Sequence, residues 1–136
     1  GGLDLSLGSV MGLAGVAGAY VAVNLGWPSV FAVIACILAG AIAGYINGQL
    51  VTRAFVPAFI VTLGMLNMAA GAARVVSDNS TITGLPQSFV DFGNLIIGGF
   101  LPSIFLVAVL VIAAGWFVLR FTVFGRMIFA VGTNDE

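Results

Sequence analysis

The sequence predicts an all-α fold, a polytopic integral membrane helix bundle with four transmembrane helices and a short interfacial helix in an external loop. Hydrophobic residues make up 61% of the chain and charged residues only 7%, whereas a soluble domain carries about 25% charged residues because its surface faces water. The apolar residues form four runs without a charged side chain, each long enough to cross a bilayer as a helix. These runs are residues 7–25, 27–46, 55–73 and 101–119.

The breaks between the runs are polar or contain a helix-starting residue. After the first run, Trp27 is suited to a membrane interface and Pro28 to the first turn of a helix. The second break contains Arg53, and the third, residues 75–100, is a long loop. We therefore expect one transmembrane domain over residues 1–136, which reads as an internal piece of a longer polypeptide.

The arginines orient the bundle. Two spans separate Arg53 from Arg120 and Arg126, so these three share one side of the membrane, while Arg74 lies on the other. Cytoplasmic loops carry the excess of positive charge. This places the tail, residues 120–136, in the cytoplasm, the loop of residues 75–100 outside, and the N-terminal residues toward the cytoplasmic half.

The second run contains a row of small residues at a spacing of four. Such a row lets a neighbouring helix backbone approach closely. We therefore predict helix packing along this row, which consists of Ala32, Cys36, Gly40, Gly44 and Gly48.

Few polar residues lie in or near the apolar runs. Asn24 and Asn47 lie near the ends of runs, while Thr62 and Asn67 lie within the third. Because an amide in hydrocarbon needs a partner or a cavity, Asn67 either bonds to another helix or belongs to a polar pathway.

The first residues, "GGLDLSLGS", place an acid at the start of a hydrophobic run. In one interpretation Asp4 or Ser6 caps the first helix. In the other, the stretch is a break between membrane helices, where irregular backbone lines a solute pathway. Both roles are compatible with one site.

The external loop contains "GLPQSFVDFGN", which predicts a short helix beginning near Pro86. Its aromatic side chains would lie along the membrane interface. The helix either caps the bundle or offers a docking surface for an external partner, with Phe89, Asp91 and Phe92 as the candidate residues.

Several classes of function are excluded. The chain has no His, only four basic residues and a single Cys, so we expect no metal site, no cofactor, no disulfide framework and no nucleic-acid partner. No catalytic constellation is recognisable, and the protein is predicted not to be an enzyme. Because ion-coupled transporters keep charged groups inside the membrane, a chain without them passes solute passively or takes energy from a partner.

Four stretches together resemble the permease subunits of bacterial ABC monosaccharide importers of the ribose/xylose/galactose type. They are "GGLDLSLGSV", "INGQLVTRAFVPAFIVTLGML", "TGLPQSF" and "FGRMIFAVGTNDE". The resemblance implies location in the bacterial inner membrane and a second permease subunit, as a homodimer, around the translocation path. It also implies a cytoplasmic ATP-binding subunit and a periplasmic sugar-binding protein. The segment Gly132, Thr133, Asn134, Asp135 and Glu136 would begin the helix that couples to the ATPase.

The sequence therefore favours the membrane-spanning subunit of an ATP-driven sugar importer. A neutral monosaccharide needs hydroxyl and amide groups along its path, for which Asp4, Ser6, Thr62 and Asn67 are the candidates. The alternative is a secondary transporter or passive channel for a small neutral solute.

Overall fold

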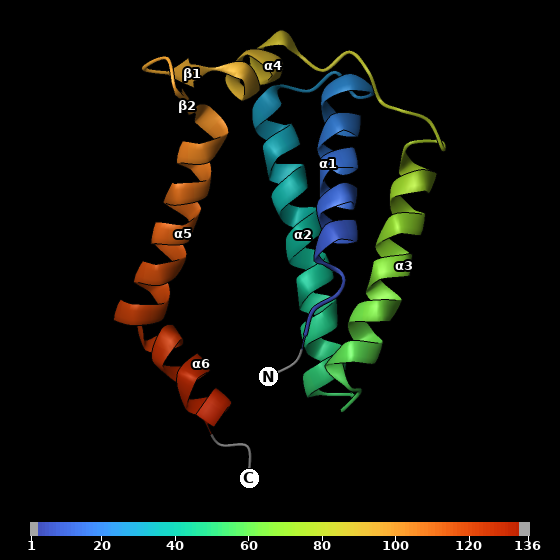
Figure 1. The fold of residues 1–136 in the computed structure, drawn as a ribbon. Coiled ribbons are helices and arrows are strands. Elements are labelled where there is room, and N and C mark those ends of the chain that lie inside the picture. Colours follow the sequence, from blue (N-terminus) through green and yellow to red (C-terminus); the bar gives the residue numbers. More distant parts are fainter. Residues whose placement is uncertain (1–2, 134–136) are drawn as a thin grey trace. The chain divides into compact units, whose positions relative to one another are not determined.

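The computed structural model describes residues 3–133, and in this range most of the chain is helical (Figure 1). The prediction of an all-α membrane helix bundle is confirmed, with three long apolar helices and one shorter one. The described residues form two compact units, residues 3–88 and residues 89–133. The elements are α1 (Leu7–Val23), α2 (Ser29–Thr52), α3 (Ala58–Val76), α4 (Gln87–Asn94), β1 (Ile96–Ile97), β2 (Leu101–Pro102), α5 (Ser103–Phe121) and α6 (Val123–Thr133).

In the first unit, α1 packs against both α2 and α3 (Figure 1). The buried positions on these helices are mostly small, so the backbones approach closely. At the tightest point, a Cβ added to Gly18 of α1 would overlap Cys36 Sγ and lie 3.0 Å from the carbonyl oxygen of Ala32. The buried apolar side chains of this unit are Ala22, Ala32, Ala43, Val61, Met65 and Ala69.

Proline marks the start of three helices. Pro28, Pro57 and Pro102 each occupy the position just before α2, α3 and α5, with extended backbone. Their rings fix φ near the helical value and lack the N–H that a helix start leaves unpaired. These three helices therefore begin two or three residues after the start of their apolar runs.

Helices α2, α3 and α5 extend past the ends of their apolar runs, because backbone hydrogen bonds rather than hydropathy set where a helix ends. Helix α2 continues to Thr52 and ends where Phe55 adopts a left-handed conformation, φ 54°. There the Val56 N–H bonds back to the Leu50 carbonyl at 3.3 Å, a helix-ending geometry that glycine usually provides.

Helix α1 is shorter than predicted. It has 17 residues and a length of about 25 Å, whereas α2, α3 and α5 are each long and apolar enough to cross a membrane. The residues before it, Leu3–Ser6, are not helical. At its other end, Gly26 has φ 65° and the Trp27 N–H bonds to the Val21 carbonyl at 3.2 Å.

The second unit contains three elements that the sequence did not predict, β1, β2 and α6. In the loop of residues 75–100, the short helix α4 is present as expected, but a small antiparallel pair, β1 and β2, follows it. Gly98 and Gly99, at φ 65° and 79°, form the connection, as positive φ is accessible to glycine without strain. In the predicted tail, the largely apolar residues after Thr122 form helix α6.

The junction of α5 and α6 is a sharp break at Thr122. The Thr122 hydroxyl donates to the Val118 carbonyl at 2.6 Å and accepts from the Gly125 N–H at 3.2 Å. Thr122 thus ends α5 and caps α6. A side chain at Gly125 would overlap the Leu119 backbone, so glycine is what lets α6 turn back against the last turn of α5.

Candidate functional site

A polar cluster joins three parts of the first unit, the non-helical Leu3–Ser6 segment, α2 and α3. The Asn47 amide nitrogen donates to the Ser6 hydroxyl at 3.1 Å, and that hydroxyl donates to Asp4 Oδ1 at 2.6 Å. Ser6 is 1% exposed and Asn47 8% exposed. The hydrogen bonds therefore run in one direction, from a buried amide to a carboxylate, and we call these three residues with Thr62 the polar cluster.

Thr62 ties the same segment to α3. Its hydroxyl lies 3.3 Å from the Leu3 carbonyl and 3.3 Å from the Phe59 carbonyl of its own helix. Thr62 is 4% exposed. The predicted pathway residues Asp4, Ser6 and Thr62 are thus brought together.

The prediction that Ser6 caps α1 is correct about its position. It is wrong about its side chain, which makes no hydrogen bond to the first turn of the helix. Ser6 occupies the position before α1, but its hydroxyl makes no capping hydrogen bond. It donates to Asp4, whose Oδ1 also accepts the Ser6 N–H at 2.8 Å. The side chains therefore stabilise a non-helical segment rather than the first turn of α1.

The polar cluster lies inside the span of the neighbouring helices. Asn47 precedes the last residue of α2, Thr52, by about 7–8 Å of helix length. The Asp4 side chain lies at the same depth and is exposed on the surface of the first unit. Because a carboxylate facing hydrocarbon is costly, by about 2.5–3.5 kcal/mol at the bilayer centre, it is expected to face protein or water.

One buried acceptor in the polar cluster is unsatisfied. Asn47 Oδ1 is shielded from solvent and has no hydrogen-bond partner. An unpaired buried acceptor costs about 1–3 kcal/mol, so this amide has binding capacity that the described part of the chain does not use. From the sequence, Asn47 was not among the candidate pathway residues, because it lies near the end of an apolar run. Asn47 lies four residues after Ala43 on the buried face of α2, and only the structure shows that this face is covered.

Asn67 is not part of the polar cluster. Its side chain is exposed and its amide donates to the Leu63 carbonyl of its own helix at 3.0 Å. The buried residues of α3, such as Thr62, Met65 and Ala69, lie on another face. Its assignment to a solute pathway stays a prediction.

The row of small residues on α2 divides between two faces. Ala32 and Cys36 meet Gly18 of α1, but a Cβ at Gly40, Gly44 or Gly48 would meet nothing within 4 Å. Each step of four residues turns about 40° around a helix, so the row leaves the α1 side, which Ala43 and Asn47 occupy further along. Packing at these three glycines stays a prediction for neighbours outside the unit.

The three predicted docking residues, Phe89, Asp91 and Phe92, all lie on α4. Phe92 is 52% exposed, and its carbonyl accepts from the buried Ser103 hydroxyl. Their role in docking stays a prediction.

Gly132 and Thr133 of the predicted coupling segment lie in the last turn of α6. Asn134, Asp135 and Glu136 lie outside the described residues. Coupling through this segment also stays a prediction.

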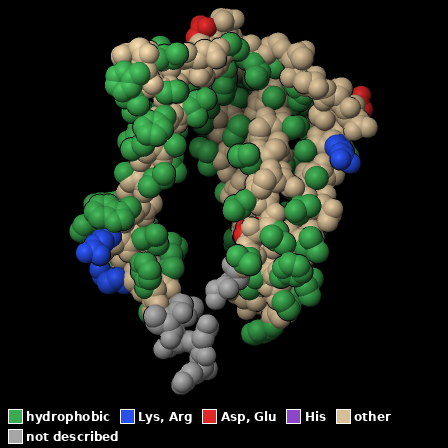
Figure 2. All heavy atoms as spheres, in the orientation of Figure 1, with side chains coloured by type: hydrophobic (Ala, Val, Ile, Leu, Met, Phe, Trp, Pro, Cys, Tyr) green, Lys and Arg blue, Asp and Glu red, His purple; other side chains and the backbone are tan. Residues whose placement is uncertain are grey.

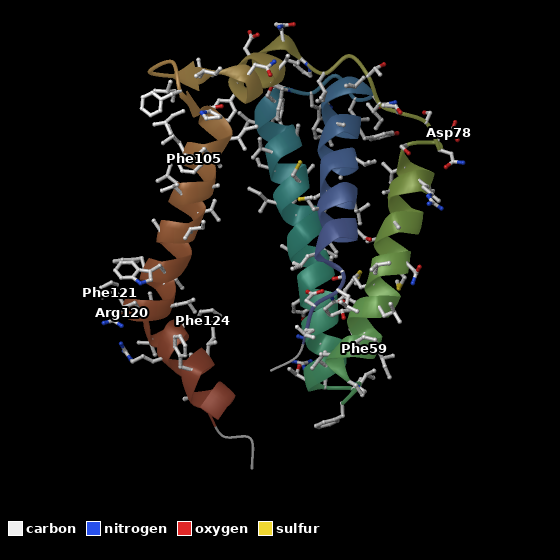
Figure 3. The ribbon with its side chains drawn as sticks, in the orientation of Figure 1. Phe59, Asp78, Phe105, Arg120, Phe121 and Phe124 are labelled. Carbon is white, nitrogen blue, oxygen red and sulfur yellow. The ribbon has the colours of Figure 1, made fainter. Side chains whose placement is uncertain are left out.

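Apart from Asp4, the charged groups of the first unit lie at the ends of its helices. Phe59 and Asp78 mark opposite ends of α3 (Figure 3), and Arg74 lies in its last turn, near Asp78. At that end, a polar pocket of ≈ 370 Å³ is lined by residues including Tyr20, Asn24 and Ser80. The end near Arg53 is the one closer to the polar cluster.

The Ser6 hydroxyl links Asn47 to Asp4 through two hydrogen bonds, so its removal should destabilise the protein. Ser6→Ala leaves the buried Asn47 amide without its acceptor, and we expect a loss of about 1–3 kcal/mol in the free energy of unfolding. Asp4→Asn keeps an oxygen that accepts both Ser6 hydrogen bonds and should cost less than half as much. Denaturation of the purified full-length protein in detergent measures both. An equal loss of unfolding free energy in both variants would mean that the charge of Asp4, rather than the Ser6 hydrogen bonds, holds the Leu3–Ser6 segment in place.

Comparison with known proteins places these features in a family. The model of the branched-chain amino acid transport system / permease component family matches residues 1–136. The fructose import permease protein FrcC of Rhizobium meliloti is 37% identical over 99% of this chain and 39% of its own length. The autoinducer 2 import system permease protein LsrC of Yersinia pseudotuberculosis (serotype O:3, strain YPIII) is 34% identical over 97% of this chain and 37% of its own length.

The chain thus spans less than two-fifths of the length of these relatives. No solved structure matches it. The chain belongs to the branched-chain amino acid transport system / permease component family, as part of a multi-pass protein of the bacterial inner membrane.

Proposed function

We propose that this chain is part of the membrane-spanning subunit of an ATP-driven importer for a monosaccharide or a similar small, neutral, polyhydroxylated solute. Family membership and the names of the two relatives, both import permeases, support a transport role. The observation that carries the solute class is the unsatisfied Asn47 Oδ1 in a polar cluster that contains no basic residue.

The chemistry of the polar cluster fits sugar hydroxyls. Its free capacity consists of acceptors, Asn47 Oδ1 and the second oxygen of the exposed Asp4 carboxylate, and a hydroxyl is a donor that suits both. A solute anion would instead need a cation or a cluster of N–H donors. The polar cluster, as the described residues form it, therefore favours a neutral polyhydroxylated solute over an acidic one.

Asn47 Oδ1 is shielded in the conformation described, so a solute must reach it through a local change. The adjacent Leu3–Ser6 segment is non-helical and is held to α2 and α3 through the side chains of Asn47 and Thr62. Such irregular backbone within a membrane is tolerated where it lines a cavity or is covered by protein. We propose that movement of this segment opens the polar cluster to the solute.

The proposed partners are a second permease subunit, as a homodimer, a cytoplasmic ATP-binding subunit and a periplasmic sugar-binding protein. Helix α6 leads into the segment proposed to couple to the ATPase, and α4 carries the residues proposed to dock the binding protein. The alternative is a secondary transporter or a passive channel, which would need neither an ATPase nor a binding protein.

Reconstitution of the complete transporter distinguishes these two functions. Proteoliposomes containing the full-length protein with its ATPase and binding protein should accumulate labelled D-fructose, D-ribose, D-xylose or D-galactose only when ATP is supplied. An ATPase subunit that cannot hydrolyse ATP is the control. Accumulation without ATP, or by the permease alone, would support the alternative and reject the ATP-driven importer.

The same assay tests the polar cluster through Asn47→Leu. We expect transport of the accepted sugar to fall about 3- to 10-fold, the effect of losing one hydrogen bond to the solute. Gln49→Leu is the matched control, since it removes a second amide from the same helix that lies outside the polar cluster, and should stay within about twofold of the parent. If both variants transport alike while the complex assembles and hydrolyses ATP, Asn47 does not contact the solute. The ATP-driven function would stand.

A further inference from the structure

The break between α5 and α6 brings two arginines to one place. Arg120 and Arg126 both line a pocket of ≈ 450 Å³, which Trp116, Leu119 and Phe129 line as well. On a continuous helix, residues six apart point about 120° away from each other. The turn at Thr122 and Gly125 instead lets both arginines line one pocket, and Figure 2 shows basic side chains gathered on this unit.

Among the residues that the structure describes, no Asp or Glu lines this pocket. No Asp or Glu occurs between Asp91 and Asp135 in the sequence. Two guanidinium groups at one site repel each other unless an anion lies between them. The pocket is therefore suited to a ligand with negative charge, and planar guanidinium groups bind phosphate oxygens in a bidentate manner.

The rest of the lining indicates where that anion comes from. Trp116, Leu119 and Phe129 make the pocket apolar on the sides that the arginines do not cover. The Trp116 ring also packs edge-on against Phe121, with 5.5 Å between ring centroids, and tryptophan favours the membrane–water interface. A free phosphate ion would gain nothing from these apolar groups, whereas the glycerol and upper acyl chain of a lipid would cover them.

The position along α5 fits the same ligand. None of the apolar, membrane-spanning stretch of α5 is buried by the described residues. Its apolar side chains are therefore available to lipid. Arg120, Phe121 and Phe124 gather at the end of this helix (Figure 3). The last turn of a span lies at the depth of the lipid headgroups.

We propose that Arg120, Arg126 and the apolar residues between them form a binding site for the headgroup of an anionic phospholipid. The phosphate lies between the two guanidinium groups and the glycerol backbone lies against Trp116 and Leu119. This site does not depend on the transported solute. It would hold α6 at a fixed angle to α5 whenever the lipid is bound.

Phosphatidylglycerol is the probe, and native mass spectrometry of the full-length protein measures its first binding step against phosphatidylcholine. We expect a preference for phosphatidylglycerol that Arg120→Gln or Arg126→Gln weakens about fivefold each, and the double variant about 25-fold. The double variant Arg53→Gln/Arg74→Gln removes the same charge elsewhere and should change that first step less than twofold. Arg120→Lys keeps the charge without the bidentate geometry and should lose affinity by a smaller factor than Arg120→Gln.

Three outcomes would overturn the site. An equal loss in the Arg53→Gln/Arg74→Gln variant would show diffuse attraction of basic residues to the membrane. Displacement of the lipid by millimolar inorganic phosphate would show a general anion site. Absence of any preference in the parent, together with its appearance in Asp135→Asn/Glu136→Gln, would show that the chain's own carboxylates occupy the pocket.

Discussion

Replacing Gly18 with leucine is expected to abolish the packing of α1 on α2 and to lower the yield of folded protein sharply. Even alanine places a carbon atom on Cys36 Sγ and 3.0 Å from the Ala32 carbonyl oxygen. The first neighbour is a side chain that can rotate, but the second is helix backbone, which cannot move without displacing α2. Overpacking of this kind costs about 1–3 kcal/mol for small additions and more for larger ones. Thermal unfolding of the full-length protein in detergent measures the effect.

The control for Gly18 comes from the same helix. A Cβ at Gly15 would meet nothing within 4 Å, so Gly15→Ala should be neutral or stabilise α1 by up to about 1 kcal/mol through helix propensity. Cys36→Gly should partly rescue Gly18→Ala, since it removes the nearest obstructing atom. If Gly18→Ala is as stable as Gly15→Ala, α1 and α2 do not approach as closely as described.

Replacing Gly125 with alanine is expected to disrupt the start of α6. The added carbon would overlap backbone atoms of Leu119, and neither helix end can give way without losing the Thr122 hydrogen bonds to Val118 and Gly125. We expect a loss of at least about 1–3 kcal/mol at this junction. Hydrogen exchange of the α6 amides should rise strongly, while the amides in the middle of α5 stay protected.

Gly115→Ala is the matched control for this junction, because a Cβ there meets nothing within 4 Å in the middle of α5. Thr122→Val should have an intermediate effect of about 1 kcal/mol, since it removes the cap but not the close approach. Unchanged protection of α6 in Gly125→Ala would mean that the helix does not turn back on α5. A disrupted junction should also weaken lipid binding by Arg120 and Arg126, because these two residues meet only where the helix turns.

Most of the helices could be predicted from the sequence because their causes are local. Uninterrupted apolar runs require helices in a membrane, and Pro28, Pro57 and Pro102 each precede a helix because proline suits that position wherever it occurs. The short helix α4 was likewise predictable from Pro86 and its aromatic face. The hairpin at Gly98 and Gly99 also has a local signal, since paired glycines between apolar residues favour such a turn.

The sequence by itself determined the membrane class, the family resemblance and the presence of an acid and a hydroxyl before the first helix. Only the tertiary structure decided which polar groups meet. Asp4 and Ser6 lie more than forty residues from Asn47, and burial of Asn47 depends on which face of α2 is covered by a neighbour. The same holds for Gly40, Gly44 and Gly48, which share a spacing with Cys36 but not its neighbour, and for Arg120 and Arg126, which meet only because the helix breaks. Hydropathy and spacing describe one segment at a time, whereas a site is made by the neighbours that packing brings to it.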